Sequence, residues 1–131
     1  MVGDRVTVQF EFVVGVNPGY LHDNAMQDPL AAVVAVWRNA AIACERNGGV
    51  YVTAVFTAGK VVWPDTPLRK CPPGGEDVVI VRGVRNPVHN KSRVRWRSSL
   101  NWICADVQRK LQQSTSTLTL HTVDFRYSVG C

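Results

Sequence analysis

The sequence lacks the features that mark membrane proteins and secreted proteins. Its longest unbroken apolar run, 30–37, is far shorter than the roughly 20 residues that a membrane-spanning helix needs. The first ten residues do not show the basic and then apolar layout of a secretion signal. We therefore expect no membrane association and a cytosolic (cytoplasmic) location.

Motifs for common catalytic and metal-binding chemistry are also missing. The chain has no P-loop, GxGxxG, HExxH or GxSxG pattern, and its four cysteines show no CxxC or Cys/His spacing. Cys44 and Cys104 fall in predicted helices and Cys71 in a proline-rich loop, so reduced thiols are favoured over disulfides. These absences predict no metal and no cofactor, and they favour a protein that is not an enzyme.

Acidic residues are scarce in the second half of the chain. Residues 1–65 carry four Lys/Arg against six Asp/Glu, whereas residues 66–131 carry eleven against four. Between Asp77 and Asp106 there is no acid at all. An asymmetry of this kind indicates a polyanionic partner.

The apolar pattern of the first half predicts a strand, a helix and a second strand. Apolar and polar side chains alternate over 6–16, as in a half-buried strand. Asp28 and Pro29 have the chemistry of a helix start, and Gly48 that of a helix end. Residues 50–57 are rich in β-forming side chains.

After the second strand, Ala58-Gly59-Lys60 predicts either a tight turn, which would create a fifth strand, or a bulge. The second half of the chain then repeats the order of the first. A loop rich in proline and glycine follows, and then a strand, a helix and a strand at 77–81, about 92–113 and 115–129. Gly15-Val16-Asn17-Pro18 recurs as Gly83-Val84-Arg85-Asn86-Pro87, which suggests an internal duplication.

A strand, helix and strand used twice predicts a single α+β domain over 1–131, with half-repeats at 4–63 and 76–129. The simplest arrangement is the ferredoxin-like βαββαβ plait, in which a mainly antiparallel sheet of four or five strands carries two helices on one face. The loops after the first and third strands then lie at opposite ends of the sheet.

The second predicted helix has a clear apolar stripe and one aromatic residue outside it. At 100° per residue the stripe is formed by Trp96, Leu100, Ile103, Cys104, Val107 and Leu111. Trp102 points to the polar side, with Arg95 and Arg109. Three interpretations stay open for Trp102: cover by a loop or by the C-terminal residues, a subunit contact, or stacking against a base or sugar.

The basic stretch before and within this helix is the main candidate site. Arginines in the first turns oppose the helix dipole by a few tenths of a kcal/mol each, which is easier to understand if an anion binds there. The predicted anion-binding or nucleic-acid-binding residues are Arg85, Lys91, Arg93, Arg95, Arg97, Trp102 and Arg109.

These observations lead to a main hypothesis and two rivals. The main one is a small non-enzymatic module whose basic face contacts an anionic partner, most plausibly nucleic acid. The first rival is an oligomeric small-ligand-binding protein or enzyme, with a pocket near Tyr20, His22 and His89 in the loops after the first and third strands. The second is an assembly role in which Trp102 or the sheet edges pair subunits into a homo-oligomer.

Overall fold

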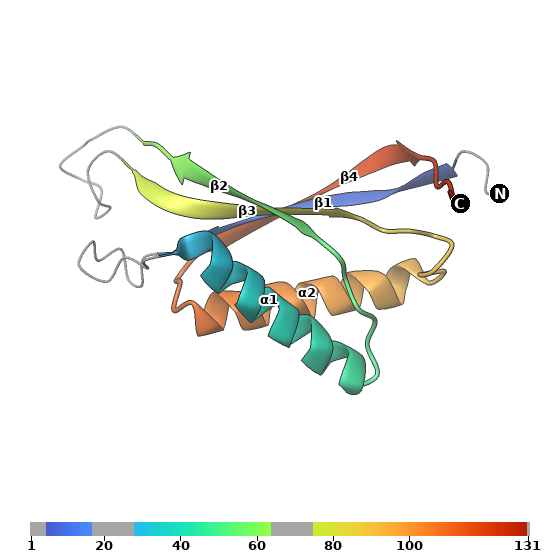
Figure 1. Ribbon diagram of the computed structural model, residues 1–131, viewed down its shortest axis with the longest axis horizontal. Helices are drawn as coiled ribbons and strands as arrows, with labels where there is room; N and C mark the ends of the chain where they lie inside the picture. Colours follow the sequence, from blue (N-terminus) through green and yellow to red (C-terminus); the bar gives the residue numbers. More distant parts are fainter. Residues whose placement is uncertain (1–4, 17–27, 64–74, 131) are drawn as a thin grey trace.

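A computed structural model describes residues 5–16, 28–63 and 75–130 of the chain (Figure 1). Their helices and strands follow one another as β1 (Arg5–Gly15), α1 (Pro29–Arg46), β2 (Val55–Val61), β3 (Glu76–Val84), α2 (Arg93–Lys110) and β4 (Ser116–Phe125). The predicted order of strands and helices is confirmed.

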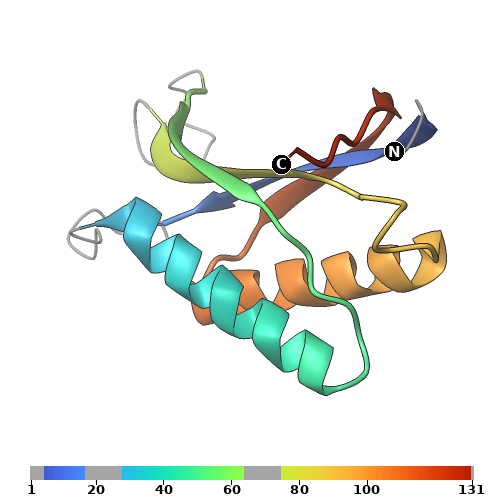
Figure 2. The same cartoon turned by 45° about the vertical axis from the view of Figure 1, so that its right-hand side comes forward.

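The strands form one antiparallel sheet in the order β2-β3-β1-β4. Both helices cover the same face of this sheet, and the opposite face is bare of helices (Figures 1 and 2). This arrangement is the predicted ferredoxin-like βαββαβ plait, with four strands. Each half of the chain contributes one βαβ unit, and their origin by duplication stays a prediction.

β2 differs from its predicted form in two ways. Residues 58–60 form neither a turn nor a bulge, because Ala58, Gly59 and Lys60 pair in unbroken register with β3. The strand begins only at Val55, although residues 50–54 also have β-forming side chains. The backbone of those earlier residues serves another purpose, since the Val52 carbonyl accepts a hydrogen bond from Trp37 Nε1 at 3.2 Å.

α1 begins and ends where the sequence predicts. The Asp28 side chain accepts a hydrogen bond from the backbone N–H of Ala31, and Pro29 occupies the first turn, where it loses no bond. Gly48 follows the helix with a positive φ of 90°, a conformation that glycine adopts without steric strain. The apolar stripe of α1 packs on the sheet through Val33, Trp37, Ala40, Ala41 and Cys44.

α2 is capped by Ser92, whose side chain accepts a hydrogen bond from the N–H of Arg95. All six residues of its predicted stripe are buried. The two helices meet the sheet around an aromatic cluster, in which Trp37 stacks on Phe10 with ring centroids 5.8 Å apart and Trp96 packs on the same ring at 6.0 Å. This cluster fixes both helices against β1.

Within the described residues, neither helix is long and apolar enough to cross a membrane.

Candidate functional site

The bare face of the sheet carries a mixture of apolar and polar side chains. Because Phe10, Phe12 and Val14 point into the core, the alternate residues of β1 point to the opposite face. There Glu11 accepts a hydrogen bond from Arg82 Nε at 2.9 Å, and both side chains are more than a third exposed. An exposed pair of this kind contributes at most about 1 kcal/mol to stability, so it organises the surface more than it stabilises the fold.

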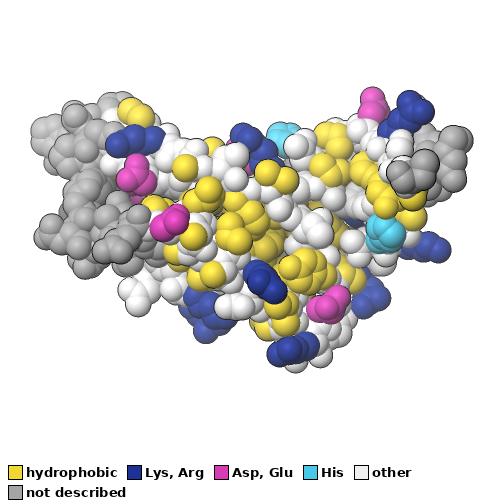
Figure 3. All heavy atoms as spheres, in the orientation of Figure 1, with side chains coloured by type: hydrophobic (Ala, Val, Ile, Leu, Met, Phe, Trp, Pro, Cys, Tyr) yellow, Lys and Arg dark blue, Asp and Glu magenta, His cyan; other side chains and the backbone are white. Residues whose placement is uncertain are grey.

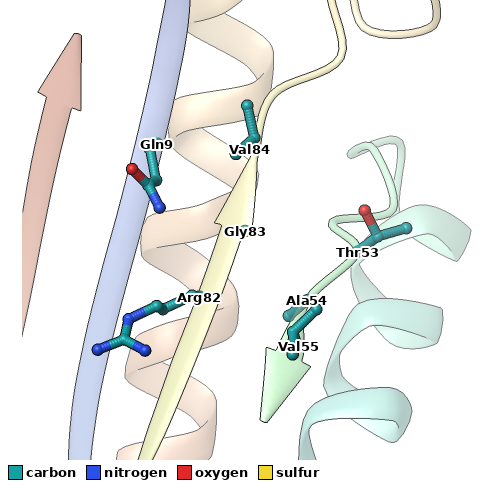
Figure 4. A pocket seen from close by; sticks show the side chains of 7 residues that line it. All are labelled: Gln9, Thr53, Ala54, Val55, Arg82, Gly83 and Val84. Carbon is teal, nitrogen blue, oxygen red and sulfur yellow. The ribbon is translucent and has the colours of Figure 1, made fainter. Parts of the chain in front are cut away.

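A pocket of about 360 Å³ opens beside this ion pair (Figure 4). It forms where β2 and β3 separate, because the pairing of the two strands ends at Val55 and Arg82. Beyond that point Gly83 lies so close to the neighbouring segment that a Cβ on it would be 2.5 Å from the Thr53 carbonyl oxygen. The lining is mostly apolar and consists of Gln9, Thr53, Ala54, Val55, Arg82, Gly83 and Val84.

The segment that forms one wall of this pocket is fixed to both helices. Trp37 of α1 holds the Val52 carbonyl, and Ser99 of α2 accepts a hydrogen bond from the N–H of Val50 at 3.0 Å. In Figure 3 hydrophobic side chains gather where α1 meets this segment. The two helices therefore hold the backbone that forms this wall of the pocket.

Glu76 is the most unusual titratable residue on the sheet. It is the first residue of β3, at the end of the sheet where β1 finishes (Figure 1). Its Oε2 atom is buried and has no hydrogen-bond partner among the residues that the structure describes. Burial raises the pKa of the Glu76 carboxyl group above its ordinary value. A buried carboxylate oxygen without a partner is costly for a fold and typical of a functional site.

Gly15 makes room for this carboxylate. A Cβ at position 15 would lie 2.9 Å from Oε2 of Glu76 and would also clash with the side-chain amide oxygen of Gln113. Gln113 Nε2 donates to the Leu111 carbonyl at 3.0 Å, which orients the amide. Gly15 is thus the last residue of β1, and two polar side chains converge on it.

Glu76 was not among the predicted site residues. In the sequence it comes at the end of a proline-rich loop, and no motif surrounds it. The one available signal is its position directly before a strand with apolar residues on both faces, where a carboxylate has little access to water.

Arg85, the first of the predicted anion-binding residues, is buried and only 5% exposed. Its Nη1 donates to the Thr7 hydroxyl at 3.3 Å and its Nη2 to the Lys91 carbonyl at 2.8 Å, whereas Nε has no hydrogen-bond partner in the described part of the chain. Burial, and secondarily the positive charge of Arg93, lowers the pKa of Arg85. This guanidinium supports the loop before α2 and does not face solvent.

The remaining predicted anion-binding residues are exposed, but two of the arginines already have partners. Arg95 donates to the Gly48 carbonyl at 2.9 Å, and Arg109 pairs with the buried carboxylate of Asp106. Trp102 is 44% exposed and lines a small hollow between the helices. Lys91, Arg93 and Arg97 lie exposed at the start of α2.

The residues of the alternative pocket are not brought together by the described structure. Tyr20 and His22 lie outside the described residues. His89 lies in the loop after β3, where its Nε2 is 3.4 Å from the hydroxyl of Tyr127. A role for these three residues stays a prediction.

The thiols that the structure describes, Cys44 and Cys104, are buried and free. Burial raises the pKa of Cys104 to about 12, which makes it unreactive at neutral pH. In the same ranges no group of three or more His, Cys, Asp or Glu could hold a metal ion.

Comparisons with known proteins identify a family. The SAM lyase family model matches residues 5–128. A solved structure described as a phage SAM lyase in complex with S-methyl-5'-thioadenosine is similar to this chain with a TM-score of 0.61 and 12% sequence identity, over 92% of this chain and 90% of that one. At this identity the structural likeness shows the fold alone. Among curated proteins, no sequence matches.

The family match corrects the main functional hypothesis. A non-enzymatic module that binds nucleic acid through a basic face was the wrong prediction, because a match over 5–128 to a family of lyases points to an enzyme. The geometry explains the error, since Arg85 is buried and Arg95 and Arg109 are engaged with other groups of the fold. The rival hypothesis of an enzyme with a ligand pocket agrees better with the match.

Proposed function

The chain belongs to the SAM lyase family, and we propose that it cleaves S-adenosylmethionine (SAM) to release S-methyl-5'-thioadenosine without adding water. The family match over residues 5–128 carries this proposal. The thioadenosine bound to the structural neighbour supports it, because that molecule is the part of SAM that remains when the amino-acid arm is removed.

The chemistry of such a cleavage is defined by the bond that breaks. In SAM a sulfonium sulfur carries the methyl group, the adenosyl group and Cγ of the amino-acid arm. Breaking the bond between sulfur and Cγ leaves the electron pair on sulfur, which becomes a neutral thioether. Cγ then completes its valence in one of two ways. Either the carboxylate oxygen of the same arm bonds to Cγ, which gives a lactone, or Cβ loses a proton and a double bond forms between Cβ and Cγ, which gives an alkene.

The change in charge during this reaction favours a site with little water. The sulfonium loses its positive charge as the bond breaks, so the transition state is less well solvated by water than the substrate is. A site that binds the charged substrate less strongly than the transition state lowers the barrier. A negative group directly against the sulfur would do the opposite, because it would stabilise the substrate more.

We therefore propose that Glu76 binds SAM away from the sulfur. Its unpaired Oε2 is an acceptor that suits the ribose hydroxyls or the α-ammonium group, both of which keep their charge state during the reaction. Gln113, whose amide oxygen lies over Gly15 beside Glu76, offers a second acceptor at the same place. The substrate-binding face is then the bare face of the sheet at the Glu76 end.

The test of this function is the incubation of the purified protein with SAM in water enriched in ¹⁸O, followed by mass spectrometry. We expect one S-methyl-5'-thioadenosine per SAM consumed and no ¹⁸O bonded to Cγ of the four-carbon product. The lactone and the alkene are isomers of equal mass, but their fragmentation and chromatographic retention differ, so the same experiment assigns the route. Absence of the thioadenosine, or ¹⁸O on Cγ, would contradict the proposal.

Two variants locate the substrate on the bare face. The pocket at Gly83 is seven residues from Glu76 along β3, or about 23 Å at roughly 3.3 Å per residue, which is too far for one SAM molecule to contact both. Val55 lines that pocket and is 68% exposed, so Val55→Glu changes the pocket with little effect on folding. We expect Val55→Glu to keep the activity and Glu76→Gln to lose most of it; the reverse result would place SAM in the pocket.

A cytosolic location is part of this proposal, and cell fractionation tests it.

A further inference from the structure

A second pocket lies on the other side of the molecule, between α2 and the strand pair β1 and β4. It encloses about 270 Å³. Its apolar wall is formed by Val8, Trp96 and Leu120, and Trp96 is only 2% exposed and packs on Phe10. The apolar wall is therefore held firmly by the core, and only the edge of the Trp96 side chain is accessible from the pocket.

Two arginines line the same pocket. Arg93 and Arg97 are four residues apart on α2, which places them on one face of the helix. Neither forms an ion pair with any residue that the structure describes, and no Asp or Glu lines the pocket. The two positive charges thus face the pocket without compensation.

This placement is unfavourable for the helix itself. Like charges four residues apart repel each other, and positive charge in the first turn opposes the helix dipole. The first turn of α2 contains no acidic residue that would offset these effects. The nearby positive charge of Arg93 also helps to lower the pKa of the buried Arg85, which adds a third cation to the region. An anion in the pocket would remove these penalties together.

We propose that this pocket binds a small organic carboxylate, with an apolar ring or chain against the wall formed by Val8, Leu120 and the edge of Trp96, and with the carboxylate between Arg93 and Arg97. Guanidinium groups bind carboxylates through paired hydrogen bonds. The apolar wall selects ligands with an apolar body over simple inorganic anions.

The pocket is separate from the proposed catalytic face. It lies beside α2 on the helix-covered side of the sheet, at the level of Val8 on β1, whereas Glu76 lies at the level of Gly15 on the bare side. These two positions on β1 are about 23 Å apart at roughly 3.3 Å per residue. The inference does not depend on the lyase activity, and the binding is measured without SAM.

The experiment follows the indole signals of ¹⁵N-tryptophan-labelled protein during titration with indole-3-acetate and, separately, with the neutral indole-3-acetamide. The chain has four tryptophans, so the Trp96 signal is identified by its loss in a Trp96→Phe variant. We expect a saturable shift of this signal with the carboxylate and at least tenfold weaker binding of the amide. No saturable shift through the millimolar range, or equal binding of acid and amide, would overturn the proposal.

Matched variants assign the charges. Arg93→Gln and Arg97→Gln should each weaken the binding of indole-3-acetate about tenfold, because each removes a charge-assisted hydrogen bond. Arg95→Gln is the control, since Arg95 lies on the same turn but donates to the Gly48 carbonyl and does not line the pocket. An equal loss of binding in all three variants would show a general effect of positive charge, and the proposed site would be wrong.

Discussion

The two ends of β3 carry ionisable side chains with buried polar atoms, and the fold holds these side chains in different ways. Glu76 opens the strand, and its buried Oε2 lacks a partner in the described ranges. Arg85 follows the last residue of the strand, and two of its three guanidinium nitrogens donate to Thr7 and to the Lys91 carbonyl. The fold thus uses the charged group at one end to hold a loop and leaves the other group available.

Burial alone therefore does not identify a functional charge. Desolvation shifts the pKa of both groups toward the neutral form. What separates them is hydrogen bonding, because an arginine that supports neighbouring backbone contributes to folding, whereas an unpaired carboxylate weakens it. Removing each group should therefore affect different properties, activity at one end and stability at the other.

The largest effect that we expect is on the activity of Glu76→Gln. This change preserves the shape of the side chain but replaces one acceptor by a donor, so the bound substrate loses a charge-assisted hydrogen bond and meets a mismatched group. We predict a decrease of about a hundredfold in kcat/KM for the formation of S-methyl-5'-thioadenosine, or about 2.7 kcal/mol. Steady-state kinetics with SAM measures it.

Asp77→Asn is the matched control for this variant. Asp77 is the next residue on β3, is exposed, and forms only a loose pair with Lys60 at 3.8 Å. Its kinetics should remain within twofold of the unmodified protein. Equal losses in both variants would mean that the general negative charge of this edge matters, and the role assigned to Glu76 would be wrong.

The second effect belongs to the opposite end of β3. Arg85→Ala removes the hydrogen bond to the Thr7 hydroxyl of β1 and the one to the Lys91 carbonyl in the loop before α2, which leaves that carbonyl without this donor. We predict a loss of about 2 kcal/mol in the free energy of unfolding, measured by urea denaturation. The turnover of the folded fraction should not change. A fully stable Arg85→Ala protein without activity would mean that Arg85 serves activity and not stability, and the role assigned to this end of β3 would be wrong.

The fold could be predicted from the sequence because its signals are local. The alternation along β1, the Asp28 and Pro29 start of α1, and the six-residue stripe of α2 each depend on neighbouring residues. The start of β2 could not be predicted in this way. Residues 50–54 have the composition of a strand, but their backbone is bound by Trp37 and Ser99 from distant parts of the chain.

The candidate site was hidden from the sequence for the same reason. Gly15, Glu76 and Gln113 come from three separate segments, and only the antiparallel pairing of β1 with β3 brings the first two together. The basic stretch, in contrast, is contiguous and easy to see. Its prominence led to a nucleic-acid hypothesis that the family match contradicts.

A third prediction tests whether the absence of a side chain at Gly15 is needed for the position of the Glu76 carboxylate. Gly15→Ala would bring its methyl group against the ends of the Glu76 and Gln113 side chains, which can move aside. Stability should therefore fall by less than about 1 kcal/mol. The displaced carboxylate should lower kcat/KM about tenfold. Unchanged kinetics in a folded Gly15→Ala protein would show that the position of Glu76 is not critical.

The smallest effect concerns stability and pH at Glu76. Because burial raises the folded-state pKa of this carboxyl above its ordinary value of 4.5, the native protein binds more protons than the unfolded chain between the two values. The stability therefore falls as the pH rises through this window and stays lower above it. Glu76→Gln lacks the titrating group, so it should be more stable than the unmodified protein at neutral pH, by less than about 1 kcal/mol. This difference should vanish as the pH is lowered toward 4.5. Urea unfolding of both proteins across this range measures it, and a variant that is less stable at neutral pH would mean that the fold depends on the Glu76 carboxylate as it does on Arg85.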